Sequence, residues 1–178
     1  RIVMDRAYFG DVNPLHPVGQ WDALGNMLGS SARRLEAAGA DFLVLATNTM
    51  HKLADGIEAA SGLDLLHICE PAAEAIRAAG LDRIALIGTA FTMEQAFYRE
   101  RLERAGLAVL VPEAADRAEI HRVIYDELVA GRFLESSRAA YRGAIERLAE
   151  RGAQGIVLGC TEISLLIRPD DAQLPLFD

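Results

Sequence analysis

The sequence predicts an α/β protein with parallel sheets flanked by helices. Short apolar runs typical of buried strands alternate along the chain with longer amphipathic stretches typical of helices. Several predicted helices end at a glycine that leads directly into the next strand, as expected for helix C-termini. One helix–glycine–strand segment also occurs twice. These observations predict repeated βα units, and the repeat predicts two pseudo-symmetric lobes.

Six strands and six helices follow from this alternation. The strands are short apolar runs, and they are predicted at Ile2–Asp5, Phe42–Ala46, Leu65–Ile68, Ile84–Gly88, Ala108–Val111 and Gly155–Gly159. The helices are the amphipathic stretches between them, and they are predicted at Trp21–Ala38, His51–Ala60, Ala72–Ala79, Thr92–Ala105, Arg117–Ala130 and Leu134–Glu150. Glycines at 39, 80 and 152 end three of these helices.

Composition narrows the classes of function. The chain has 178 residues, of which 51% are hydrophobic, and its formal net charge is −8. It has no cluster of basic residues, so we expect no nucleic-acid partner. No apolar run approaches the roughly 20 residues that span a bilayer, and no signal peptide is recognisable, so we expect a cytoplasmic protein without a membrane partner.

Cysteine and lysine are scarce. Cys69 and Cys160 are far apart in the sequence and lack a histidine cluster, which disfavours a metal site or a disulfide framework. Lys52 is the only lysine, so a pyridoxal Schiff base would have one candidate. We therefore expect no metal site, and these counts disfavour pyridoxal chemistry.

The repeat places polar clusters at equivalent points. Residues 33–49 align without a gap to residues within 145–162, which matches Thr47–Thr49 with Cys160–Glu162. Each cluster follows a buried strand, and open α/β sheets bind ligands at the carboxyl ends of their strands. The sequence therefore predicts an active site in the cleft between the two lobes.

Cys160 is the main chemical candidate. It follows Gly159 at a polar turn from strand to helix, where a helix N-terminus lowers the pKa of a thiol. Cys69 ends another strand without a matching polar cluster, so we expect a buried apolar side chain there.

Three further groups supply donors. Thr47–Thr49 could hold a carboxylate or cap the following helix, and Thr89 has the same two interpretations at the end of its own strand. His51 and His121 lie on predicted helices, and His51 is the better candidate for handling protons because it follows Thr47–Thr49 closely.

Five stretches resemble the cofactor-independent aspartate/glutamate racemase family. They are Thr-Asn-Thr-Met-His-Lys at 47–52, the segment 86–95, the segment 120–128, Gly-Cys-Thr-Glu-Ile at 159–163 and the closing segment 174–178. The resemblance implies a homodimer of two-lobed chains that racemise small acidic amino acids without pyridoxal phosphate. Thiols on opposite faces of the substrate would remove and return the α-proton.

The resemblance also implies a role for each site residue. Cys160 is the principal acid or base, and Thr47 replaces the usual first cysteine as a weaker counterpart. Side chains at the strand ends would bind or orient the substrate, and they are Asn48, Thr49, Thr89, Thr161, Glu162 and His51. Lys52 or Arg6 would supply the cation for the distal carboxylate.

The lobes are expected at residues 1–80 and 81–170, with 171–178 returning toward the first lobe. Both ends are expected to be truncated, because complete family members have a further strand and a further helix. Two alternatives stay open. One is a single-cysteine decarboxylase resembling arylmalonate decarboxylases, and the other is a truncated ligand-binding form without turnover.

Overall fold

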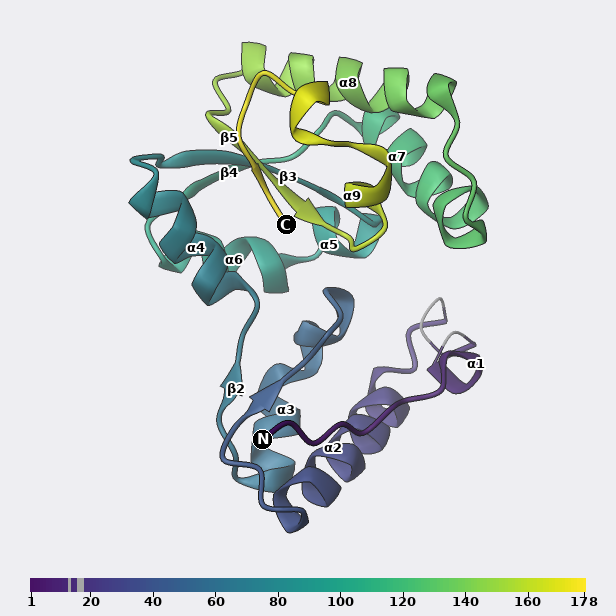
Figure 1. Cartoon of the computed structure of the whole chain (residues 1–178), viewed down its shortest axis with the longest axis vertical. Coiled ribbons are helices and arrows are strands. Elements are labelled where there is room, and N and C mark those ends of the chain that lie inside the picture. Colours follow the sequence, from purple (N-terminus) through teal and green to yellow (C-terminus); the bar gives the residue numbers. More distant parts are fainter. Residues whose placement is uncertain (13, 16–17) are drawn as a thin grey trace. The chain divides into compact units, whose positions relative to one another are not determined.

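A computed structural model describes residues 1–12, 14–15 and 18–178 (Figure 1). The chain forms two compact units. Unit 1 contains residues 1–46 and 50–67, and unit 2 contains residues 47–49 and 68–178. All strand pairs are parallel in both units, and helices flank the strands. The predicted class, α/β with parallel sheets flanked by helices, is confirmed.

Unit 1 is built on one short parallel pair of strands. Its elements are α1 (Phe9–Val12), α2 (Trp21–Ala37), β1 (Leu43–Val44), the 3-10 helix η1 (Thr49–Leu53), α3 (Ala54–Ser61) and β2 (Leu65–Leu66). Leu43 pairs with Leu65, and both are buried against α2 and α3. Successive side chains of a strand point to opposite faces, so Val44 and Leu66 are exposed on the face opposite this core.

The predicted strand at Ile2–Asp5 is wrong, because this segment forms no strand within the described residues. Ile2 is 93% exposed and Met4 is 83% exposed, so the segment has no buried face. A strand needs a neighbour for its backbone groups and a core for one face. The Arg34 guanidinium instead donates to the Asp5 carboxylate, with an Nε–Oδ2 distance of 2.8 Å.

Unit 2 contains a four-stranded parallel sheet in the order β4–β3–β5–β6. These strands are β3 (Arg83–Gly88), β4 (Ala108–Leu110), β5 (Gly155–Gly159) and β6 (Leu176–Phe177). The predicted bounds of β5 are confirmed, and β3 begins one residue earlier than predicted. β6 was not predicted from the sequence, because it has only two residues and follows a proline.

The remaining elements of unit 2 are helical. They are α4 (Cys69–Ala78), α5 (Ala90–Glu94), α6 (Ala96–Arg104), α7 (Ala114–Asp126), η2 (Leu128–Ala130), α8 (Glu135–Glu150), α9 (Ile163–Leu166) and η3 (Pro169–Asp171). The single helix predicted at Thr92–Ala105 is divided in two, because Gln95 has extended backbone angles with ψ 148°.

The central strands of unit 2 are covered on both faces. Figure 1 shows α7 and α8 on one side of the sheet and α4 and α6 on the other. On β3, Ala85 and Ile87 join the core that includes α7 and α8, whereas Ile84 and Leu86 join the core that includes α4 and α6. This alternation explains why the strands are apolar throughout.

The chain passes from unit 1 to unit 2 between residues 67 and 68, whereas the boundary predicted from the sequence lies between 80 and 81. The reason is that α4 packs against α6, so it belongs to unit 2. Residues 171–178 also belong to unit 2, where β6 pairs with β5.

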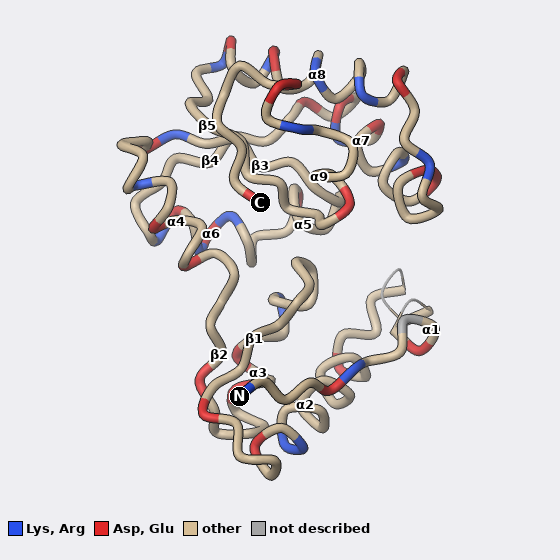
Figure 2. Tube along the Cα trace, in the orientation of Figure 1, with Lys and Arg blue, Asp and Glu red and all other residues tan. Residues whose placement is uncertain are grey.

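The surface helix α8 of unit 2 carries charged residues of both signs. Figure 2 shows basic and acidic residues spaced along α8. Arg147 on this helix binds the Asp116 carboxylate of α7 through two nitrogens, at 2.6 and 2.8 Å.

None of the helices in the described residues is both long and apolar enough to cross a membrane.

Candidate functional site

The carboxyl ends of β3 and β5 place two predicted site residues on neighbouring strands. Gly88 pairs with Gly159, and the next residues along the two strands are Thr89 and Cys160. The glycine pair is required by close packing: a Cβ on Gly88 would lie 2.8 Å from the Gly159 carbonyl oxygen, and a Cβ on Gly159 would lie 2.8 Å from Thr92 Cγ2. The sheet therefore places Thr89 and Cys160 next to each other, at the edge formed by the carboxyl ends of its strands.

Cys160 and Glu162 form the chemical centre of this edge. The Cys160 thiol donates to the Glu162 carboxylate with an Sγ–Oε2 distance of 3.1 Å, and the Thr161 hydroxyl donates to the same oxygen at 2.8 Å. Only 8% of Cys160 is exposed. A thiol beside a carboxylate can pass its proton to that carboxylate and become a thiolate.

The expected lowering of the Cys160 pKa is wrong. Burial, and then the hydrogen bond and negative charge of Glu162, raise the pKa of Cys160 to about 12. The expected lowering depended on the N-terminus of a helix, but α9 begins only at Ile163 and has four residues. The thiol is therefore protonated near neutral pH in this structure.

Replacing Glu162 by glutamine tests this interaction. We expect the pKa of Cys160 to fall, because the substitution removes the negative charge that disfavours the thiolate. In a Cys69→Ser background, the alkylation rate of Cys160 with iodoacetamide, measured from pH 7 to 11, should then rise at a lower pH in Glu162→Gln. An unchanged profile would contradict the coupling.

Thr89 is the N-cap of α5, as one of its two interpretations predicted. Its Oγ1 accepts a hydrogen bond from the Thr92 backbone N–H at 3.4 Å, and it lies 3.2 Å from the Thr92 hydroxyl. Both threonines are buried. The cap fixes the Thr89 side chain beside the end of β5.

Thr47–Thr49 belong to unit 2 by their contacts, although η1 begins at Thr49. Thr47 is half-buried, and Asn48 and Thr49 are buried. Asn48 Oδ1 accepts no hydrogen bond from any residue that the structure describes. A buried carbonyl without a donor is costly, so this oxygen suits a ligand that brings one.

The other predicted site residues lie in unit 1. His51 is buried, and its ring centre lies 4.5 Å from that of His67. Lys52 Nζ lies 4.0 Å from the ring centre of Trp21. Arg6 is exposed in the N-terminal segment.

From the sequence, His121 is a weaker candidate than His51, and Tyr125 has no predicted role. His121 Nδ1 accepts the backbone N–H of Ala90, the first residue of α5, at 3.1 Å. The Tyr125 ring centre lies 4.8 Å from the His121 ring centre. His121 and Tyr125 are four residues apart on a predicted helix, which places both side chains on one face. This spacing was the sequence signal that could have identified the pair.

Cys69 lies in the core of unit 2, as expected for a buried apolar side chain. Its thiol donates to the Tyr98 carbonyl oxygen at 3.9 Å, and burial raises its pKa to about 12. Across residues 1–12, 14–15 and 18–178, histidine, cysteine and acidic side chains form no group of three suited to a metal ion.

Comparison with protein families gives one match over nearly the whole chain. The profile of the Asp/Glu/hydantoin racemase family matches residues 2–178. A glutamate racemase from Koribacter versatilis is 34% identical over 91% of this chain and 55% of its own length. The chain therefore spans about half the length of that relative. The broad specificity amino-acid racemase RacX from Bacillus subtilis is 24% identical over 88% of this chain and 67% of its own length.

Solved structures show the same fold. A Yersinia pestis protein described as a candidate Asp/Glu racemase matches with a TM-score of 0.93 and 47% identity, over 99% of this chain and 77% of that chain. An aspartate racemase homologue from Pyrococcus horikoshii OT3 matches with a TM-score of 0.79 and 33% identity, over 89% of this chain and 70% of that chain.

Proposed function

This chain belongs to the Asp/Glu/hydantoin racemase family, and on that basis we propose that it racemises acidic amino acids by moving the α-proton with a thiol. The observation that carries the proposal is the Cys160–Glu162 pair at the carboxyl end of β5, beside Thr89, which directly follows β3. A buried thiol with a carboxylate partner can both give and take a proton at carbon. The reaction needs no bound cofactor.

In the proposed reaction the Cys160 proton moves to Glu162, and the thiolate then removes the α-proton of the substrate. The electron pair left on the α-carbon is delocalised into the substrate carboxylate, where the Thr89 hydroxyl donates a hydrogen bond to the developing charge. Thr161 donates there as well once Glu162 is protonated and releases the Thr161 hydroxyl. A proton returned to the opposite face gives the other enantiomer. Asn48 Oδ1, the buried acceptor described above, receives an N–H from the substrate ammonium.

Thr47 occupies the place of the second acid–base group in this proposal. A threonine hydroxyl is a much weaker acid than a thiol, so Thr47 acts as a donor or holds a water molecule that exchanges the proton. We therefore expect different rates from the two enantiomers. Thr49 completes the donors of this segment, His51 orients it, and Lys52 or Arg6 supplies positive charge toward the distal carboxylate.

The direct test uses the wild-type chain with L-aspartate or L-glutamate in deuterated water, without pyridoxal phosphate. We expect loss of the α-proton signal in the NMR spectrum and formation of the D enantiomer, detected by chiral chromatography. Release of CO₂ from an arylmalonate with no exchange on either amino acid would instead identify a single-cysteine decarboxylase. Binding of aspartate with no exchange would identify a ligand-binding form.

A further inference from the structure

Two hydrogen-bond donors lie together on one face of α7. His121 Nδ1 accepts the Ala90 N–H, so this nitrogen carries no proton and the ring is the neutral tautomer with its hydrogen on Nε2. Tyr125 is one helical turn further along, and the two ring centres are 4.8 Å apart. The backbone bond from α5 therefore fixes His121 as a donor next to the Tyr125 phenol.

Both donors are unused in the part of the chain that the structure describes. Tyr125 packs against the core cluster that contains Cys160, and both Tyr125 and His121 are half-buried. No acceptor for the Tyr125 hydroxyl or for His121 Nε2–H is present among the described residues. Tyr141 differs, because its hydroxyl donates to the Ile120 carbonyl oxygen at 2.9 Å.

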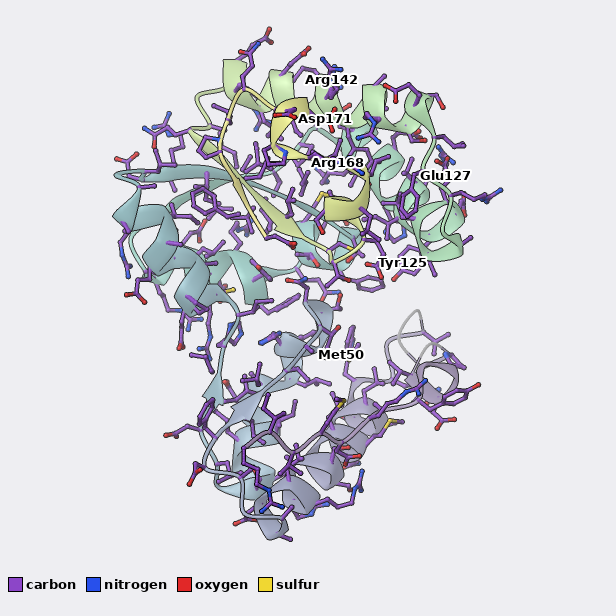
Figure 3. All side chains as sticks on the ribbon, in the orientation of Figure 1. Met50, Tyr125, Glu127, Arg142, Arg168 and Asp171 are labelled. Atoms are coloured by element: carbon purple, nitrogen blue, oxygen red, sulfur yellow. The ribbon has the colours of Figure 1, made fainter. Side chains whose placement is uncertain are left out.

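The surroundings keep the Tyr125 hydroxyl protonated. Burial raises the pKa of Tyr125, and Cys160, when ionised, and the Glu162 carboxylate raise it further. In Figure 3 the Tyr125 side chain lies at the edge of unit 2 that carries α5 and α9. Two neutral donors here suit an acceptor with two oxygens.

We infer that the His121 Nε2–H and the Tyr125 hydroxyl bind the side-chain carboxylate of a dicarboxylic substrate. This inference rests on the proposed function. Thr89 and Thr161 stand directly beside Cys160, so they serve the groups attached to the α-carbon. The donor pair comes from a separate helix and reaches the far end of the substrate. The donor pair acts together with a cation, because two neutral donors leave the negative charge of the carboxylate uncompensated.

The test compares succinate with butyrate, which differ by one carboxylate. Isothermal titration should show that the wild-type chain binds succinate at least about tenfold more tightly than butyrate, the effect of hydrogen bonds to a charged group. Tyr125→Phe removes one hydroxyl. His121→Asn removes the Nε2–H donor and keeps an acceptor for Ala90. Each change should reduce the succinate-to-butyrate preference about fivefold to tenfold, with little change for butyrate.

Tyr141→Phe is the matched control. It removes a tyrosine hydroxyl that is already bonded to the backbone, so it should lower the melting temperature and leave the succinate preference unchanged. A wild-type chain without preference, or a preference that survives both donor substitutions, would overturn the inference. Deuterium exchange on aspartate tests the racemase reaction separately, so either proposal can fail while the other is supported.

Discussion

Replacing Cys160 by serine is expected to slow α-proton exchange on L-aspartate by about a thousandfold. General acid–base groups contribute factors of roughly 10² to 10⁴, and a serine hydroxyl cannot replace a thiol as acid or base at neutral pH. The substitution is nearly isosteric, so the hydrogen bond to Glu162 and the fold should persist. Proton NMR in deuterated water measures the rate, and circular dichroism checks the fold.

Cys69→Ser is the control for that experiment. Cys69 is also buried and also has a raised pKa, but its thiol donates to the backbone carbonyl of Tyr98 in the core of unit 2. Serine at 69 should lower the stability and leave the exchange rate per folded molecule within about twofold of the wild-type rate. Equal losses of activity in the two variants would remove the special role assigned to Cys160.

Gly88→Ala is expected to lower the free energy of unfolding by about 3 kcal/mol. The new Cβ would lie 2.8 Å from the Gly159 carbonyl oxygen, which belongs to the paired strand β5 and cannot rotate away. The two strands would have to separate at the point where Thr89 and Cys160 follow. Urea unfolding followed by circular dichroism measures the loss.

The matched control is Gly56→Ala in the middle of α3. Apart from its chain neighbours and its own helix backbone, no described atom lies within 4 Å of a Cβ built on Gly56, and its backbone is helical. Alanine at an exposed helical position should therefore stabilise the chain by about 0.5 to 1 kcal/mol. If both glycine substitutions destabilise equally, the contact between Gly88 and Gly159 does not explain the effect.

Residues with strong local signals were predicted well. β5 combines a glycine after α8 with an uninterrupted apolar run, and its bounds were predicted from that pattern. Gly39 and Gly152 both have positive φ, at 83° and 93°, as expected for the glycines that end the helix in each copy of the repeated segment. Such features depend on neighbouring residues only, so the sequence reveals them.

Features set by distant contacts were not predicted. The apolar run Ile2–Asp5 has the composition of a strand, but no described strand pairs with it. β6 exists because β5 offers an open edge, which its own two residues cannot reveal. The pKa of Cys160 was predicted with the wrong direction, because burial and the orientation of Glu162 depend on packing around the finished turn.

The donor pair on α7 was missed for a related reason. A histidine and a tyrosine four residues apart are common on helices, and nothing local distinguishes these two. What distinguishes His121 is the Ala90 N–H from another helix, which selects its tautomer. Likewise, the fold supplies an acceptor to the Tyr141 hydroxyl, and the described residues supply none to the Tyr125 hydroxyl.

The pairing of β3 with β5 also sets the order in which the site can form during folding. β4 lies on the other side of β3 and follows it closely in the chain, but β5 is reached only after α7 and α8. Pairing strands that are distant in sequence requires closure of a long loop, which is the slow class of folding event. A nascent chain that has not yet supplied β5 can therefore fold α5 and cap it with Thr89, but it has no reactive centre.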